Sequence, residues 1–192
     1  MEMLVSVMIG IGLSAACGFR VFVPMLGVSI AALSGNLQLA PGFAWLGSWP
    51  VFCALLCATV LEIAAYYVPW LDNLMDSIAS PLAPLAGAIL TASVITDMSP
   101  FLRWGLAIIA GSGSAGLVQL ATVGLRAGSS SSTGGFANFF LSTFELFGAA
   151  GMTLVTLLLP LLGLLLALLL LVLGWFGVKR ALVWAKRSAS PV

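Results

Sequence analysis

The sequence predicts an all-α fold, a polytopic transmembrane helix bundle of about six spans with broken or kinked helices. The chain of 192 residues is 61% hydrophobic and only 7% charged, whereas roughly a quarter of a soluble domain is charged. Apolar runs near the length of about 20 residues that spans a bilayer recur along it. So few charges exclude a soluble enzyme, a disordered chain and a nucleic-acid binder, which needs a basic patch.

The first apolar run, Met3 to Leu33, is about ten residues longer than one span requires. It contains Gly18, Arg20 and Pro24 in its middle. Because proline removes a backbone donor and clashes with the preceding turn, we expect a kink or break near these residues. The polar stretch from Gly35 to Ser48 is then predicted to be a loop.

Three serine–proline signals indicate the starts of later helices, since serine caps free amides and proline fits the first turn. They are Ser48 with Pro50, Ser80 with Pro81, and Ser99 with Pro100. The corresponding spans are predicted at Trp49–Val68, Pro81–Thr96 and Pro100–Leu125. Between the first two, Trp70 to Ile78 is too short and polar to cross and is typical of an amphipathic segment at the membrane interface.

The C-terminal part begins with a Ser/Gly run, Gly128 to Gly135, that predicts a loop. The following segment, Phe136 to Val178, would measure roughly 64 Å as one helix at 1.5 Å per residue. Because this is twice the bilayer core, the segment must turn, either at Gly148–Gly151 or near Pro160.

Six crossings divide a single membrane domain, residues 1–192, into three per half, about 1–98 and 99–178, with a basic tail at 179–192. An odd number per half suggests the hypothesis of a three-plus-three inverted repeat. The basic residues Lys179, Arg180, Lys186 and Arg187 predict a cytoplasmic C-terminus in the inner membrane of the cell. Six spans would place the N-terminus on the same side.

Eight charged residues lie between Met3 and Val178, and two are clear candidates for intramembrane sites. Glu62 follows an uncharged apolar run, so it is either an ion, proton or substrate site, or a structural partner of Arg20, or a protonated group bonded to backbone. Arg20 beside a broken helix either meets an anionic group or extends along the membrane to the interface.

Each of the further candidate residues has a functional and a structural interpretation. Glu145 either joins such a site or completes a capping box with Ser142. Asp72 and Asp76, one turn apart with Asn73 beside them, either hold a cation or proton or form the solvated face of the interfacial segment. Asn138 follows a Gly-rich loop that suits an anion only weakly. The remaining charged residues near span ends are expected to be solvated: Asp97, Arg103 and Arg126.

No histidine is present, which removes the usual general base and the commonest metal ligand. The cysteines Cys17, Cys53 and Cys57 lie in apolar runs and are expected to be buried thiols, because zinc would lack a fourth ligand. We therefore expect no catalytic residues, no metal and no cofactor. The expected partners are membrane lipids and a small solute or ion, not nucleic acid.

Several motifs occur in order along the chain. They are Gly18-Phe19-Arg20 with Pro24, Leu61-Glu62-Ile63, Pro69-Trp70-Leu71-Asp72-Asn73 with Asp76, Pro81-x-x-Pro84-x-x-Gly87, and Thr133-Gly134-Gly135-x-x-Asn138-x-x-x-Ser142-x-x-Glu145. Together they resemble the bacterial membrane family called domain of unknown function 4126, over about Gly10 to Val178. The resemblance implies a small multi-pass inner-membrane protein and no particular activity.

The resemblance also favours one set of candidate substrate- or ion-binding residues: Arg20, Glu62, Asp72, Asn73, Asp76, Asn138 and Glu145. Phe139 and Tyr66-Tyr67 depart from the family pattern, which has a proline and an acidic residue there. The leading functional hypothesis is a small-solute or ion transporter that uses the intramembrane arginine and glutamate. The alternative is a non-catalytic membrane scaffold or lipid-binding protein.

Overall fold

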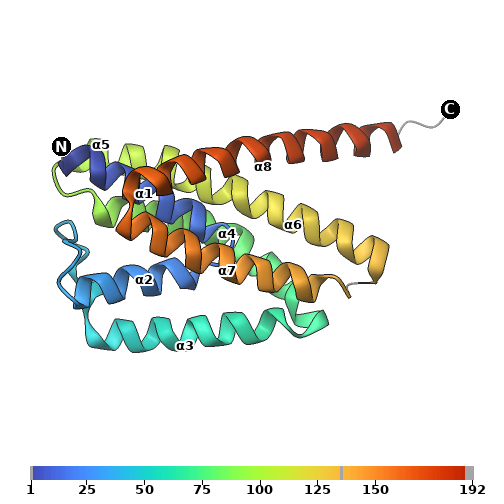
Figure 1. Ribbon diagram of the computed structural model, residues 1–192, viewed down its shortest axis with the longest axis horizontal. Coiled ribbons are helices and arrows are strands. Elements are labelled where there is room, and N and C mark those ends of the chain that lie inside the picture. Colours follow the sequence, from blue (N-terminus) through green and yellow to red (C-terminus); the bar gives the residue numbers. More distant parts are fainter. Residues whose placement is uncertain (1, 135, 189–192) are drawn as a thin grey trace.

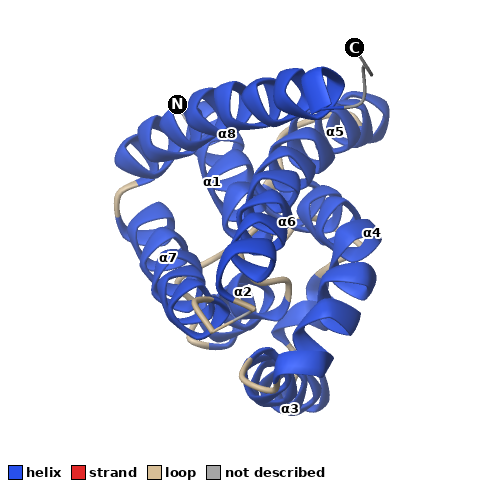
Figure 2. Cartoon of the chain, turned by 90° about the vertical axis from the view of Figure 1, so that its right-hand side faces the viewer, coloured by secondary structure: helices blue, strands red, loops and turns tan. Residues whose placement is uncertain are grey.

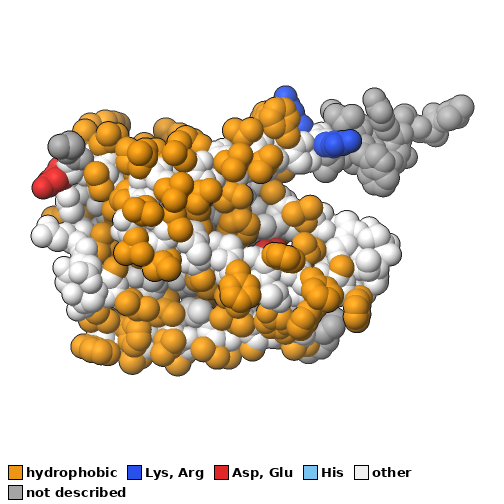
Figure 3. Space-filling view, in the orientation of Figure 1, with side chains coloured by type: hydrophobic (Ala, Val, Ile, Leu, Met, Phe, Trp, Pro, Cys, Tyr) orange, Lys and Arg blue, Asp and Glu red, His pale blue; other side chains and the backbone are white. Residues whose placement is uncertain are grey.

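The structure, a computed structural model, describes residues 2–134 and 136–188, apart from the side chains of residues 69, 70, 73 and 181–188. Every regular element in these ranges is helical, which confirms the predicted helical bundle. Figure 1 shows the helices packed along one long axis, with the start of the first helix and the end of the last at opposite ends. Apolar side chains cover most of the face seen in Figure 3, as expected for a surface in contact with lipid.

Five helical segments are long and apolar enough to cross a membrane. They are α3 (Trp49–Tyr66), the Leu74–Val94 part of α4 (Pro69–Val94), the continuous segment Pro100–Thr133, α7 (Asn138–Leu158), and the Pro160–Arg180 part of α8 (Pro160–Ser188). The continuous segment consists of α5 (Pro100–Leu106), a π-helical stretch η2 (Ala107–Ser112) and α6 (Gly113–Thr133). A 3-10 turn, η1 (Ala44–Gly47), precedes α3.

The first apolar run forms two short helices, α1 (Glu2–Cys17) and α2 (Phe22–Leu33), that fold back on each other as a helical hairpin. Both arms lie against one end of α7, since a Cβ at Gly12 would meet Thr156 and one at Gly27 would meet Thr153. The turn reaches the other part of α7, where Arg20 bonds to Ser142. These positions on α7 are separated by roughly 20 Å of helix, so the hairpin enters and leaves the bundle at the same end.

Because of this hairpin, the described residues hold five candidate spans, one fewer than the six crossings predicted. Met3 to Leu33 breaks near Gly18, as predicted, but its second arm returns instead of continuing across (Figure 1). The start of α1 and the end of α8 therefore lie at opposite ends of the bundle, not on one side. The first half holds a hairpin and two candidate spans while the second holds three, so the described residues do not divide into the three spans per half that suggested an inverted repeat.

Helix α4 begins at Pro69 and continues through Pro81 and Pro84, so the predicted interfacial segment and the predicted start at Ser80 are both wrong. The difference has a physical cause. Asp72 and Asp76 suggest a solvated face, but both side chains are buried against other helices. Prolines within a membrane helix are tolerated where neighbouring helices and serine side chains satisfy the backbone, and Ser80 Oγ donates to the Asp76 carbonyl at 2.7 Å.

The other boundaries follow local signals more closely. Helix α3 matches its predicted span to within two residues, and the turn between α7 and α8 falls at Pro160, one of the two predicted places. The predicted loop at Gly128 to Gly135 is wrong over most of its length, since α6 continues to Thr133, with hydroxyls of the run donating to carbonyls of the same helix. Gly134, with a φ of +63°, ends that helix.

Small residues bring α1, α4 and η2 into close contact at the centre of the bundle. A Cβ at Gly87 would lie 2.7 Å from the Gly111 carbonyl oxygen, and Ser14 Oγ donates to the Gly87 carbonyl at 2.7 Å. This agrees with the packing role of small residues between membrane helices. In the end-on view of Figure 2, α3 lies at the edge of the bundle beside α2 and α4.

Candidate functional site

The hairpin turn places polar groups inside the bundle. Helix α1 ends at Cys17, and α2 begins at Phe22. Gly18 is required at the turn, since a Cβ there would lie 2.4 Å from Val118 Cβ and 2.6 Å from the Ala115 carbonyl oxygen. The turn therefore packs directly on α6 and exposes the first amides of α2 to α3.

Glu62 of α3 caps the start of α2. Its Oε1 accepts the Val21 amide at 2.8 Å and its Oε2 accepts the Phe22 amide at 3.1 Å. A carboxylate is favoured here because a helix N-terminus has free N–H groups and partial positive charge. Glu62 is only 2% exposed, and it makes no ion pair with Arg20 within 4 Å. Of the structural alternatives for Glu62, the structure therefore shows the group bonded to backbone and not the pair with Arg20.

Arg20 is buried at the turn, with 1% of its surface exposed. Its Nη2 donates to the Ser142 carbonyl at 3.0 Å and lies 3.8 Å from Glu145 Oε2. Its guanidinium lies 3.7 Å above the Tyr66 ring. Extension to the membrane interface is therefore excluded for Arg20. Its Nε and Nη1 are buried and have no hydrogen-bond partner among the described residues.

Arg126 of α6 and Glu145 of α7 form a buried bidentate ion pair through Nε and Nη2. Arg126 Nη1 also lies 3.7 Å from Asp76 Oδ1 of α4. Solvation of Arg126 at a span end was thus a wrong expectation. The capping box with Ser142 is also wrong, because Ser142 lies inside α7 and donates to the Tyr66 carbonyl at 3.3 Å.

Tyr66 contacts both arginines and is the residue that sequence reasoning missed. Arg20 and Arg126 lie 3.7 and 4.2 Å from its ring centroid. The signal was its position four residues after Glu62, on the same face of α3. We call Arg20, Arg126, Glu145 and Asp76, packed around Tyr66, the arginine network.

Asp72 and Asn138 form a second group, nearer the end of the bundle. Asn138 Nδ2 donates to Asp72 Oδ2 at 3.0 Å and to Ser130 Oγ at 3.0 Å. Asp72 Oδ1 and Asn138 Oδ1 are buried and have no hydrogen-bond partner among the side chains that the structure describes. The prediction of a solvated face for Asp72, which is 2% exposed, is wrong.

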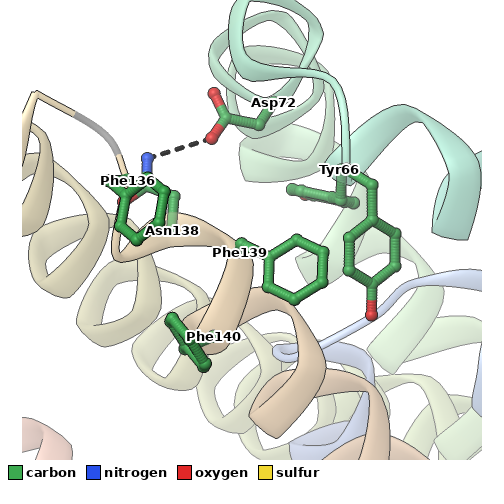
Figure 4. Close-up of a pocket in the computed structure, with 7 residues that line it drawn as sticks. Tyr66, Asp72, Phe136, Asn138, Phe139 and Phe140 are labelled. Carbon is green, nitrogen blue, oxygen red and sulfur yellow. Dashed lines mark hydrogen bonds between the residues drawn. The ribbon is translucent and has the colours of Figure 1, made fainter.

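A cavity of about 430 Å³ opens beside this pair. Figure 4 shows the rings of Tyr66, Phe136 and Phe139 gathered next to the Asp72–Asn138 hydrogen bond. Apart from this pair, the lining is aromatic: Tyr66, Tyr67, Phe136, Phe139 and Phe140. We call this the aromatic pocket. Tyr66 belongs to both groups, so the pocket adjoins the arginine network at this residue.

The remaining candidates lie apart from these groups. Asn73 has no described side chain, so its predicted role falls outside the described residues. Asp97 is exposed, as expected, but Arg103 is buried with its guanidinium 5.9 Å from the Phe43 ring. Cys17 is buried, whereas Cys53 and Cys57 are exposed on α3, which corrects the expectation for those two.

The two groups differ in whether their charges are paired. In the arginine network two cations face two carboxylates, and Glu62 is neutralised in part by the helix that it caps. Asp72 has no ion-pair partner among the described residues. No cluster of three or more His, Cys, Asp or Glu suited to a metal ion occurs in the part of the chain that the structure describes.

A bundle with apolar spans, a helical hairpin and a buried ionic network defines a multi-pass membrane protein. The chain belongs to the family of the domain of unknown function (DUF4126), whose model matches residues 7–180. The chain matches no curated protein and no solved structure.

Proposed function

We propose that the protein is a small-solute or ion transporter of the inner membrane and not an enzyme. The observation that carries this proposal is the arginine network at the turn of a helical hairpin inside the bundle. Discontinuous helices with polar turns are the usual place of substrate and ion sites in secondary transporters. Ionisable residues inside a membrane protein are costly and are kept where they act on a solute or ion.

The contacts of Glu145 would allow it to exchange one arginine partner for another. Its Oε2 is bonded to Arg126 and lies 3.8 Å from Arg20, whose Nε and Nη1 have no partner. A small shift of Glu145 toward Arg20 would therefore replace one charge-assisted contact with another. Such a shift would leave Asp76 as the carboxylate facing Arg126, and it would couple occupancy at Asp76 to movement of the hairpin.

The orientation follows the basic end of α8. The C-terminal part of α8, which contains Lys179 and Arg180, lies at the end of the bundle where α4 begins (Figure 1). Residues near the start of α4 and the start of α7 line the aromatic pocket. The positive-inside rule then assigns this end to the cytoplasm. The pocket becomes the cytoplasmic mouth, and the hairpin enters from the opposite side.

The test is charge movement in proteoliposomes. The purified full-length chain is reconstituted, and currents are recorded on a solid-supported membrane after jumps of H⁺, Na⁺ or choline chloride. We expect a current for at least one gradient and at least a tenfold smaller current for Asp76→Asn. Asp97→Asn, an exposed acidic residue at the other end of α4, is the matched control and should behave as the wild type. No current with any of the three gradients would reject transport.

A lipid-binding role is the second candidate function, favoured by a cavity of about 590 Å³ between α6 and α8. Its lining is almost entirely apolar and includes Val118 and Leu125 of α6 and Leu170 of α8, and Gly174 of α8 adds no side chain to it. An acyl chain fits such a groove because nothing there requires a polar partner.

Native mass spectrometry tests this second candidate. Gly174→Leu would fill the groove and should remove the lipid that co-purifies with the wild type. Gly151→Leu is the matched control, since Gly151 is exposed and a Cβ there would have no neighbouring atom within 4 Å. Equal lipid retention in both variants would reject the groove as a lipid site.

A further inference from the structure

We infer that the aromatic pocket binds an organic cation, a quaternary ammonium or protonated amine, through the Asp72 carboxylate and the surrounding rings. The inference rests on the proposed function in one respect, because it names the substrate class that the transporter would carry. Binding itself does not require transport, so the two proposals can fail separately.

The charge of Asp72 favours a cation as the ligand. This carboxylate is 2% exposed, and its only hydrogen bond in the described structure is donated by the neutral Asn138 amide. Its Oδ1 and the Asn138 Oδ1 have no hydrogen-bond partner within the described part of the chain. A buried carboxylate needs an opposite charge or several donors, and here both unpartnered atoms are acceptors. The pair therefore favours a ligand that is positively charged or donates hydrogen bonds.

The aromatic lining favours an organic group around that positive charge. Tyr67 and Phe139 meet edge to face with centroids 5.0 Å apart, and Phe139 and Phe140 do the same at 5.7 Å. Rings at such angles present faces in more than one direction. Ring faces attract cations, and aromatic cages are the common recognition site for quaternary ammonium groups. A carboxylate set among rings thus favours a bulky, weakly hydrated cation.

The scarcity of oxygen atoms in the pocket disfavours a metal ion. Ca²⁺ takes six to eight oxygen ligands, and Mg²⁺ needs near-octahedral oxygen coordination. Few oxygens line the pocket beyond those of Asp72, Asn138 and the two tyrosine hydroxyls. The cavity of about 430 Å³ lies within the range of roughly 300–1,000 Å³ typical of small-molecule sites.

The experiment measures binding to the purified full-length protein in detergent micelles by isothermal titration calorimetry. The probes are choline and its neutral carbon isostere, 3,3-dimethylbutan-1-ol, which share shape but differ in charge. We expect choline to bind at least tenfold more tightly than the isostere. Asp72→Asn should weaken choline binding at least tenfold, and the control Asp97→Asn should leave it unchanged.

A second pair of variants keeps the carboxylate and changes a ring. Tyr67→Leu should weaken choline binding at least fivefold, whereas Tyr67→Phe, which keeps the ring and loses only the hydroxyl bond to Thr143, should not. If Asp72→Asn fails to fold, these two variants still test whether choline binds in the aromatic pocket.

Three results would overturn the inference: equal binding of choline and its isostere, choline binding unaffected by both Asp72→Asn and Tyr67→Leu, or displacement of choline by equimolar sodium chloride. Choline binding without any current in proteoliposomes would reject transport alone. A current without choline binding would reject the organic cation alone.

Discussion

Arg126 and Glu145 form a bidentate ion pair that joins α6 to α7 inside the bundle. Bidentate guanidinium–carboxylate contacts are among the strongest charge-assisted hydrogen bonds. Because both side chains are buried, the pair either holds these two helices in register or, when it opens, lets them move. Its energetic coupling is therefore the first quantity to measure.

A double-mutant cycle with Arg126→Met and Glu145→Met measures that coupling. Each single variant should lose about 3–5 kcal/mol of unfolding free energy, because it removes the closest partner of a buried charge and leaves only the longer contact of Arg126 with Asp76 or of Glu145 with Arg20. The double variant should lose less than the sum, with a coupling of about 1–3 kcal/mol. Denaturant unfolding in micelles gives these values, and Glu2→Met, at an exposed residue, is the control. A coupling below about 0.5 kcal/mol would show that the pair does not act as a unit.

Substitutions at Glu62 test its role as the cap of α2. Glu62→Gln keeps one acceptor for the Val21 and Phe22 amides, and Glu62→Leu keeps none. Since an unsatisfied buried group costs about 1–3 kcal/mol, we expect stability to fall from wild type to Gln to Leu. Hydrogen exchange of the peptide over residues 18–25 should accelerate in the same order.

Thr59→Val is the control for that series, because the Thr59 hydroxyl bonds only to the Leu55 carbonyl of its own helix. It should leave the exchange of residues 18–25 unchanged. Equal stability and exchange in Glu62→Leu and the wild type would remove the capping role and return Glu62 to the functional candidates.

Alanine substitutions at two glycines distinguish a closely packed position from one with open space around it. In Gly18→Ala the new Cβ would lie 2.4 Å from Val118 Cβ, and such overpacking costs about 1–3 kcal/mol. Gly124→Ala, inside α6 with nothing within 4 Å, should instead stabilise the helix by up to about 1 kcal/mol. Thermal unfolding of the two variants should shift in opposite directions. A parallel shift would mean that Gly18 does not pack on α6 as described.

Features set by local chemistry could be predicted from the sequence. The Ser48 and Pro50 signal placed the start of α3, Gly18 and Pro24 placed the break of the first run, and Pro160 marked the turn before α8. Each of these depends on backbone donors and allowed dihedral angles within a few residues. The candidate list drew on the rarity of charge in an apolar chain, and all its members with described side chains are buried.

Features set by distant partners could not be predicted. Asp72 and Asp76 suggest a water-facing surface until Asn138 and Arg126, on α7 and α6, are placed against them. The role of Tyr66 depends on two arginines from elsewhere in the chain. Sequence pattern also cannot distinguish one long kinked span from two half-length helices, because both bury the same apolar residues.

The hairpin determines which residues share a side of the membrane. If Met3 to Leu33 crossed once, residues 2 and 36 would lie on opposite sides. In the hairpin they lie on the same side, and residue 132, at the end of α6, lies on the other. Single cysteines at Glu2, Asn36 and Ser132, in a chain whose three native cysteines are alanine, report each position to a membrane-impermeant maleimide.

We expect Glu2→Cys and Asn36→Cys to label in intact spheroplasts and Ser132→Cys only after permeabilisation, because the basic end of α8 is predicted to be cytoplasmic. All three side chains are exposed, so burial does not confound the labelling. Opposite labelling of positions 2 and 36 would contradict the hairpin. If Glu2→Cys and Asn36→Cys both label only from the cytoplasm, the hairpin stands but the orientation in the membrane is reversed. The aromatic pocket would then lie at the outer face.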